Sequence, residues 1–407
     1  MKKLLKTCCL FLSLLLAGCA ADSSTIESNS DSGENEGTKT EILEEAEKLK
    51  EGYYIDEAIE KLNENSWLAE DIDVQKKIDE YTEYKDSFAK YTGEVEHIFF
   101  HSLIVYPELA FDNIGHSANG YNMWFVTVDE FKNILPNLYE RGYVLVNIKD
   151  VYKQDSIGKT VIQDVYLPEG KKPLILSQDD VNYYDYMKTD GFADRLVIDE
   201  DNQVSTLVRN KNNEEQVTRD GDMVPIVDDF IKEHPDFSYR GAKGTLAITG
   251  YEGALGYRLK TEEEKEEAKK VAEKLKEDGW TFASHSYTHN GDGFFQGVQN
   301  YDNLKYDFTK WNDEIKPILG DTNLFISPFG ATLEGNNVNL VTEFGFDTYC
   351  NVSRLPENEY AGNLIITPRY NIDGYTLLEC KDSLRKLFFD PDEVLVPNVR
   401  PVLKVED

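Results

Sequence analysis

The 407-residue sequence predicts an α/β fold with parallel strands, preceded by a small all-α region. From residue 95 onward, short apolar runs alternate with segments in which apolar residues recur at helical spacing. This alternation is typical of βαβ units, arranged either as an open sheet or as a barrel. Before residue 95, the apolar residues that follow the polar N-terminal stretch recur at helical spacing. The length allows both a large core and an accessory domain.

The composition excludes two classes of protein. Hydrophobic residues make up 40% and aromatic residues 12% of the chain, so it is not wholly disordered. Lys and Arg number 43 against 76 Asp and Glu, which gives a formal net charge of -33. So acidic a chain, with no basic stretch to offset the charge, is poorly suited to binding a phosphate backbone. Nucleic acid is therefore not expected as a partner.

The first residues predict export and a lipid anchor. Three lysines precede the apolar run Leu10 to Leu16, which leads to Ala17, Gly18 and Cys19. This order is typical of a signal peptide, here residues 1–18, which is too short for a permanent membrane span. Residues 16–19 also resemble a bacterial lipobox, which implies cleavage before Cys19 and diacylation of its thiol. The protein would then be extracytoplasmic and anchored to the bacterial cell membrane, whereas ordinary secretory cleavage is the alternative.

Two further regions precede the α/β part. Residues 19–40 are rich in Ser, Glu, Asn and Gly and are expected to form a flexible tether. Residues 41–92 predict two or three amphipathic helices with a break at Glu51-Gly52. The segment from Ala46 to Leu62 resembles one tetratricopeptide-type hairpin. A single hairpin cannot bury its own apolar face, so this helical domain should pack on the next one, as a spacer or as a partner-binding surface.

The elements of the α/β part follow one another at regular spacing. A hairpin is expected at 199–202, and the segment 181–242 is long for a βαβ unit and is a candidate flap. Two cysteines, Cys350 and Cys380, could pair outside the cytoplasm or stay free. The expected strands are 98–100, 144–146, 174–176, 245–249, 281–284, 324–327, 348–352 and 364–368, and the expected helices are 128–141, 224–233, 262–278, 306–319 and 337–344.

Two histidines follow an expected strand. His285 and His289 lie just after the strand at 281–284, where polar residues form sites in parallel α/β folds. A four-residue spacing on a turn can bring both imidazoles to one metal ion. Surface placement by chance is the alternative.

Two adjacent carboxylates follow another expected strand. Asp179 and Asp180 come directly after the apolar run at 174–176 and two polar residues, a costly place for charge unless the carboxylates bind something or face water. A solvated turn is the simple interpretation. Together with His285 and His289, one carboxylate would complete an Asp-His-His zinc site with an open fourth position. The other carboxylate would be free to act as a base.

These segments resemble the polysaccharide deacetylases, carbohydrate esterase family four with NodB homology. The family's Thr-Phe-Asp-Asp-Gly motif corresponds to Ser177 to Val181, with Gln178 in place of Phe and Val181 in place of Gly. Its His-Ser/Thr-x-x-His motif is matched in full at 285–289, and its Pro-x-Gly motif at Pro328-Phe329-Gly330. The resemblance covers about residues 95–378. It implies a distorted (β/α) barrel over residues 93–407, preceded by the helical hairpin domain.

The family's C-terminal Leu-x-His motif is absent, because no histidine follows His289. The chain is closer to a poly-N-acetylglucosamine deacetylase-like branch, in which an N-terminal Tyr-His-Ser segment supplies the catalytic histidine. Phe100-His101-Ser102 fits that segment with Phe in place of Tyr, which implies that His101 is the general acid. The alternative for His101 is the polar end of a core strand. His97, His116 and His234 lack this context and are expected on the surface or in loops.

The resemblance also implies a role for each candidate site residue. Asp180, His285 and His289 would hold Zn²⁺ or another divalent transition metal, and Asp179 would take a proton from water. Backbone groups at residues 328–330 would stabilise the oxyanion. Arg369 could orient Asp179, although a surface ion pair is an equal alternative. Sugar rings could stack on Trp124, Tyr183, Tyr184 and Tyr287, with ordinary packing of these aromatic side chains as the alternative.

The sequence thus predicts a membrane-tethered, metal-dependent hydrolase that removes N-acetyl groups from a cell-surface glycan. Peptidoglycan and poly-N-acetylglucosamine are the candidate substrates. An alternative enzyme is an O-acetyl esterase that acts on a polysaccharide such as xylan. A second alternative is a non-catalytic, glycan-binding lipoprotein on a decayed deacetylase fold, since Gln178 and Val181 depart from the motif. The oligomeric state stays open.

Overall fold

The computed structural model describes residues 31–352 and 357–404, with side chains from residue 37 onward. The predicted signal peptide and the lipidation site Cys19 lie outside the described residues. None of the described helices combines the length and the apolar character that a membrane span requires.

The N-terminal region consists of three helices, α1 (Asp31–Glu51), α2 (Ile55–Asn63) and α3 (Ile72–Asp86). Helix α1 begins within the segment that composition assigned to a tether. Residues 31–40 hold two glycines and few good helix formers, so this extension depends on propagation from the packed part of α1 and on the ion pair between Lys39 and Asp71 at 2.6 Å. The three helices share a small core of their own, formed by Ile42, Ala46, Ile55, Ala58, Leu62, Leu68, Val74 and Tyr81.

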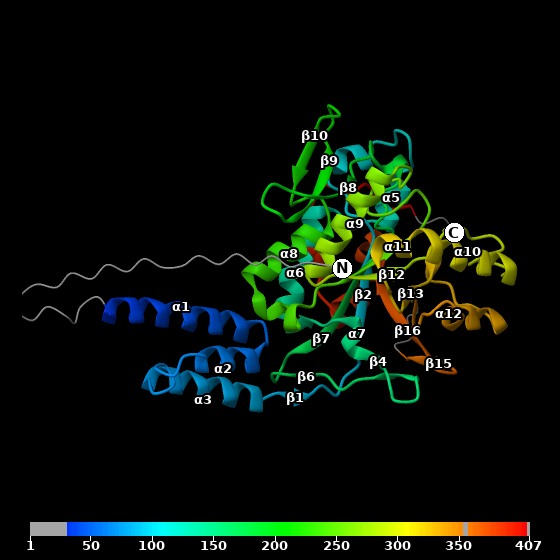
Figure 1. Cartoon of the computed structure of the whole chain (residues 1–407). Coiled ribbons are helices and arrows are strands. Elements are labelled where there is room, and N and C mark those ends of the chain that lie inside the picture. The colour runs from blue at the N-terminus through cyan, green and yellow to red at the C-terminus, as the bar shows by residue number, and fades with distance from the viewer. Residues whose placement is uncertain (1–30, 353–356, 405–407) are drawn as a thin grey trace, which may run out of the picture.

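This helical unit packs against the α/β part (Figure 1). Tyr53, in the turn between α1 and α2, is buried, and its hydroxyl donates a hydrogen bond to the carbonyl oxygen of Asp236 at 2.9 Å. Its ring lies 5.3 Å from that of Tyr239. An ion pair joins Arg240 to Glu57 of α2. The contact follows the expectation that a lone helical hairpin needs a neighbour to cover its apolar face.

The α/β part is a closed barrel. Among the described residues, seven parallel strands form a ring in the order β2-β7-β11-β12-β13-β14-β16, with β16 pairing β2 again. Outside the ring, β3 (Tyr143–Leu145) pairs β7 in parallel and β15 (Glu359–Ala361) pairs β16 antiparallel. The predicted barrel is therefore confirmed. Its strands are β2 (Glu96–Phe100), β7 (Lys172–Gln178), β11 (Thr245–Ile248), β12 (Thr281–Ser284), β13 (Leu324–Ile326), β14 (Thr348–Val352) and β16 (Leu364–Asn371).

The strands of the ring are joined unequally, which distorts the barrel. β2 and β7 are paired along the whole of β2, and β14 and β16 along the whole of β14. By contrast, β12 and β13 are paired only at Ser284 and Phe325 within the described residues. β7 pairs β11 only through Ser177 and Gln178, at the carboxyl end of β7. β16 pairs β2 only through Tyr370 and Asn371, at the carboxyl end of β16.

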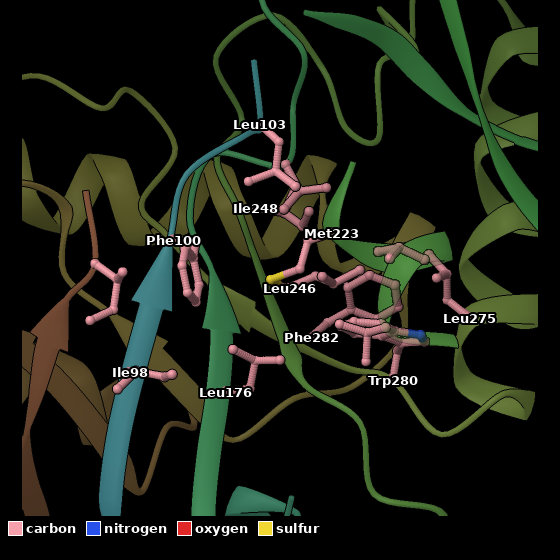
Figure 2. Packing of buried hydrophobic residues seen from close by; sticks show 14 of the residues in the cluster. Ile98, Phe100, Leu103, Leu176, Met223, Leu246, Ile248, Leu275, Trp280 and Phe282 are labelled. Atoms are coloured by element: carbon pink, nitrogen blue, oxygen red, sulfur yellow. The ribbon is translucent and has the colours of Figure 1, made fainter. Parts of the chain in front are cut away.

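Side-chain alternation along the strands separates two cores. Outward-facing residues of the strands pack against the surrounding helices, and Figure 2 shows Ile98 and Phe100 of β2 beside Leu176 of β7. Inward-facing residues such as Ile175 and Ile365 fill the barrel. Since side chains alternate with a period of two, the same register that places Ile175 inside also directs Ser177 and Asp179 inward. Polar groups thus gather at the carboxyl end of the barrel interior.

Helices cover the outside of the barrel. Threonine capping boxes begin two of them, with Thr127 and Glu130 at α6 and Thr261 and Glu264 at α9. The main helices are α6 (Val128–Glu140), α8 (Met223–Glu233), α9 (Glu262–Glu277), α10 (Tyr301–Glu314) and α12 (Asn339–Glu343). The shorter elements are β1 (Ala89–Lys90), α4 (Pro107–Ala110), α5 (Ala118–Trp124), α7 (Ile148–Val151), β4 (Tyr152–Gln154), β5 (Thr160–Ile162), β6 (Tyr166–Leu167), α11 (Lys316–Leu319), α13 (Gly374–Glu379), α14 (Lys381–Leu387) and α15 (Pro391–Val394).

The insertion after β7 forms a small sheet of its own. Strands β8 (Ala193–Ile198), β9 (Val204–Arg209) and β10 (Glu215–Thr218) are antiparallel, and the hairpin expected at 199–202 joins β8 to β9. In Figure 1 this sheet lies at the top of the barrel, away from α1–α3. Cys350 and Cys380 are not joined by a disulfide.

One histidine lies where the sequence analysis did not expect it. His97 was expected on the surface or in a loop, but it is buried in β2, and its Nε2 lies 2.9 Å from the hydroxyl of Ser177. The reason is register, because odd-numbered residues of β2 face the barrel interior. His116 lies in a loop and pairs with Asp190 at 2.9 Å, and His234 follows the end of α8.

Candidate active site

Three predicted metal ligands converge at the carboxyl end of the barrel. Asp180 follows β7, and His285 and His289 follow β12. The Oδ1 atom of Asp180 lies 3.6 Å from Nε2 of His289 and 3.9 Å from Nε2 of His285. One ligand atom from each of the three residues lies within 4.8 Å of the others. A carboxylate and two imidazoles at this spacing fit a divalent transition metal such as Zn²⁺.

The ring of His285 is oriented by a neighbouring strand. Its Nδ1 lies 2.8 Å from the carbonyl oxygen of Ile326, at the end of β13. A carbonyl can only accept, so Nδ1 carries the proton and Nε2 presents a lone pair towards Asp180 and His289. Burial lowers the pKa of His285, which favours the neutral form that binds metal.

The loop that carries both histidines is held by Asp307 of α10. This buried carboxylate accepts hydrogen bonds from the backbone N–H groups of Tyr287 at 2.7 Å and Thr288 at 2.8 Å, and from the Thr288 hydroxyl at 2.7 Å. His289 adopts a positive φ of 47°, a region that disfavours ordinary side chains. The hydrogen bonds that Asp307 accepts therefore hold a tight turn that the sequence alone does not favour. No motif in the sequence singles out Asp307.

Asp179 is held by Arg369 deep in the barrel. Both side chains are almost fully buried, and two hydrogen bonds join them, at 2.7 and 2.8 Å. Burial raises the pKa of Asp179, but the Arg369 guanidinium and His285 outweigh this effect and bring the pKa below its usual value. Arg369 also lies over the ring of Phe99 at 3.9 Å. Of the two alternatives for Arg369, the structure favours orientation of Asp179 over a surface ion pair.

His101 lies at the end of β2, on the same side of the barrel. Its ring is within 5.8 Å of Phe99 and 5.7 Å of Phe125, measured between ring centroids. A positive charge on His101 lowers the pKa of both Asp179 and Asp180, although burial and nearer groups have larger effects. Its Nδ1 atom is buried and has no hydrogen-bond partner among the described residues. His101 thus carries a buried ring nitrogen whose hydrogen-bonding capacity is not used within the described residues.

The Pro328–Gly330 segment forms a short 3₁₀ turn after β13. Phe329 has a φ of 58° and is half exposed, with its ring 4.6 Å from that of His289. The segment predicted to stabilise an oxyanion therefore borders the metal ligands.

A buried carboxylate that the sequence analysis missed explains one departure from the family motif. Asp222 of the insertion accepts hydrogen bonds from the Gln178 amide at 2.8 and 2.9 Å and from the Tyr183 hydroxyl at 2.5 Å. It also accepts from the backbone N–H of Leu103 at 3.0 Å. Gln178 precedes Asp179, and Leu103 lies two residues after His101, so Asp222 ties the two loops together. Asp222 also caps α8, where it accepts a hydrogen bond from the backbone N–H of Met223 at 2.8 Å, and no motif in the sequence points to its other bonds.

The aromatic residues expected to stack on sugars are placed differently from one another. Tyr183 and Tyr184 are only 1% and 6% exposed, so neither can stack on a sugar, and that prediction is wrong. Both are tied down by their hydroxyls, Tyr183 to Asp222 and Tyr184 to Asp180 at 2.7 Å. Trp124 is exposed, and the hydroxyl of Tyr287 donates to Glu314.

The sequence matches no protein-family model and no curated protein. Its structure is similar to the Streptococcus pyogenes deacetylase PplD solved with acetate, at 14% identity and a TM-score of 0.41, over 74% of this chain and 96% of that one. It is also similar to IcaB from Ammonifex degensii, at 12% identity and a TM-score of 0.41, over 70% and 94%. A third similar structure is the de-N-acetylase from Aggregatibacter actinomycetemcomitans, at 11% identity and a TM-score of 0.40. The match covers 69% of this chain and 96% of that one. The solved structures that the chain resembles thus include deacetylases, the class that its motifs resemble, while the geometry of the site carries the function proposed below.

Proposed function

We propose that this protein is a metal-dependent hydrolase that removes N-acetyl groups from a glycan. One observation carries the proposal: Asp180, His285 and His289 converge beside a second carboxylate, Asp179, which is bound to Arg369 and lies 3.9 Å from Nε2 of His285. This is the donor set of a catalytic zinc site with a base beside it. A divalent ion bound there supplies Lewis acidity, since it lowers the pKa of water and polarises a carbonyl.

The chain's own residues account for the proton transfers of amide hydrolysis. Asp179, kept ionised by Arg369, accepts a proton from the attacking water. Backbone groups at Pro328–Gly330 stabilise the negative charge on the former acetyl oxygen. His101 donates a proton to the sugar nitrogen as the carbon–nitrogen bond breaks. The products are acetate and a free amine on the sugar.

The decayed-scaffold alternative is weakened by the surroundings of the altered motif. The Gln178 amide donates to Asp222, although its Oε1 has no partner among the described residues, and Asp179 is bound at both oxygens. We therefore interpret the change at Gln178 as a local adaptation to the insertion. O-acetyl esters remain the competing substrate class, because the same groups would cleave them.

The substrate and the location are proposed from the sequence. A diacylated Cys19 would place the enzyme outside the cytoplasm on the bacterial membrane, where peptidoglycan and poly-N-acetylglucosamine are the accessible N-acetylated glycans. A Cys19→Ala variant is expected in the soluble fraction of cells that retain the parent protein in the membrane fraction. Equal membrane retention of both would contradict the anchor.

The test of the activity is acetate release from peptidoglycan, chitooligosaccharides and acetylated xylan, measured side by side. We expect release from an N-acetylated glycan, loss after chelation and recovery with Zn²⁺. A protein that binds no metal even after incubation with zinc would defeat the proposal, and release from xylan alone would favour the esterase.

The first variant to measure is Asp179→Asn. It removes the proton acceptor but leaves all three metal ligands, so we expect metal content to be unchanged and deacetylation to fall by about 100-fold or more. Asp180→Ala is the matched comparison, because it should lose the metal as well. Activity that survives in Asp179→Asn would assign the base to another group.

A further inference from the structure

Two exposed tyrosines, Tyr186 and Tyr251, lie against Tyr184, whose hydroxyl binds the metal ligand Asp180, and Tyr186 also contacts the ring of His116 at 4.9 Å. We propose that Tyr186 and Tyr251 form a sugar-binding subsite that stacks on the N-acetylhexosamine ring next to the one being deacetylated. The inference rests on the proposed function and deepens it, because it assigns residues that would make the enzyme prefer oligomers to single sugars.

The two rings are connected to the metal ligands through one buried side chain. Tyr184 donates its hydroxyl to Oδ1 of Asp180 at 2.7 Å. The ring of Tyr184 lies 5.7 Å from that of Tyr186, nearly parallel to it at 11°, and 5.7 Å from that of Tyr251. Tyr184 therefore links both exposed rings to the metal ligand Asp180 through a single side chain.

The exposure of these side chains suits stacking. Tyr186 and Tyr251 are 42% and 51% exposed, whereas Tyr184 between them is 6% exposed. A tyrosine offers an apolar face for the C–H groups of a pyranose and a hydroxyl for its polar edge. Neighbouring exposed rings at the rim of a site are typical of a binding surface rather than of a solvated one.

The subsite is held rigid by bonds between two loops. Tyr186 belongs to the loop after β7, and Tyr251 to the loop after β11. The Glu252 carboxylate accepts a hydrogen bond from the backbone N–H of Asp185 at 2.7 Å. Arg258 contacts the Asp185 carboxylate at 3.1 Å and the carbonyl oxygen of Glu252. A surface ordered before binding loses less entropy when it binds a ligand.

Charged groups surround the two rings. Asp185 is paired with Arg258 and with Lys188, at 3.1 and 2.6 Å. Asp180, Glu252 and Asp190 also act electrostatically on Tyr186, so acids outnumber bases around it. Stacking on the two rings, and not charge, is therefore what the subsite offers an N-acetylated sugar.

The test compares the parent enzyme with a Tyr186→Ala/Tyr251→Ala double variant on the chitooligosaccharides from dimer to pentamer. We expect kcat/KM for the pentamer to fall by about tenfold, mainly through KM, with the loss growing as the oligomer lengthens. Hydrolysis of 4-nitrophenyl acetate should be unchanged, because it needs the metal site alone. Tyr186→Phe should keep the stacking and the parent values. Tyr166→Ala is the matched control, since Tyr166 is similarly exposed but lies on β6, next to β1.

A second measurement separates this subsite from the proposed function. Chitopentaose is titrated calorimetrically into zinc-loaded Asp179→Asn protein, with and without the two alanines. We expect affinity to fall by about tenfold in the triple variant. Equal affinity in both, or no binding to Asp179→Asn, overturns the subsite whatever the activity. Absence of acetate release from every glycan by zinc-loaded parent protein overturns the proposed function instead.

Discussion

Asp179 and Arg369 are the residues whose environment most directly controls the proposed chemistry. A carboxylate that is buried at the carboxyl end of a barrel would ordinarily hold its proton, because burial penalises the charged form. The paired guanidinium reverses this effect and leaves an ionised base beside the metal ligands. The position of the Asp179 carboxylate matters as much as its charge. The two hydrogen bonds from Arg369, one to each oxygen, fix the plane of this carboxylate.

Replacement of Arg369 separates these two contributions. Arg369→Ala leaves Asp179 buried without its partner, so we expect the free energy of unfolding to fall by about 3–5 kcal/mol and deacetylation to be lost. Arg369→Lys keeps the charge but cannot form both bonds. It should recover most of the stability and little of the activity. Denaturant unfolding and acetate release check the pair, and full activity of Arg369→Lys would show that charge alone suffices.

At the scale of elements, loops after neighbouring strands are fixed by carboxylates from outside the motifs. Asp307 of α10 holds the loop with His285 and His289, and Asp222 of the insertion joins the loops after β2 and β7. Both are buried acceptors without a cationic hydrogen-bond partner among the described residues, and burial raises the pKa of each. They act on the site through the backbone and side chains that they position.

Loss of Asp307 should weaken metal binding without removing a ligand. We expect Asp307→Ala to reduce zinc affinity by about 10- to 100-fold, as is typical when a group that orients a metal ligand is removed. Chelator competition measures this directly. Asp302→Ala is the matched control, because Asp302 lies exposed in the first turn of the same helix. Equal zinc affinity in both variants would show that the loop keeps its shape without Asp307.

Restoring the family motif at Gln178 should damage this protein. Gln178→Phe removes the amide that donates to Asp222 and leaves a buried carboxylate with fewer partners, which costs about 1–3 kcal/mol. We expect lower stability and lower activity than in the parent, with partial recovery in Gln178→Phe/Asp222→Asn. Thermal unfolding and acetate release measure both. A gain of activity in the single variant would support the view that the motif has decayed.

At the scale of the whole molecule, the barrel and the convergence of Asp180, His285 and His289 could be predicted because their signals are local. Apolar runs that end in Asp179-Asp180 or lead to His285 place polar groups at strand ends, whatever the rest of the fold. Burial and long-range pairing could not be predicted. The partner of Gln178 lies 44 residues away within the insertion. The burial of His97 depends on register, which a strand pattern with polar residues on one face does not reveal.

The unequal pairing of the strands divides the barrel into three segments, β2-β7, β11-β12 and β13-β14-β16, that meet through few ladder bonds. Asp180 belongs to the first segment and His285 and His289 to the second. A bound ion would therefore connect two segments that share few ladder hydrogen bonds. Ligand that binds only the folded state adds about 2.7 kcal/mol at 100 times its dissociation constant. We therefore expect chelation to lower Tm and to speed amide hydrogen exchange first in β7 and β11. Uniform acceleration of exchange across all strands of the ring would contradict this. If the contact between β7 and β11 opens without zinc, the enzyme would limit its own lifetime wherever the metal is scarce.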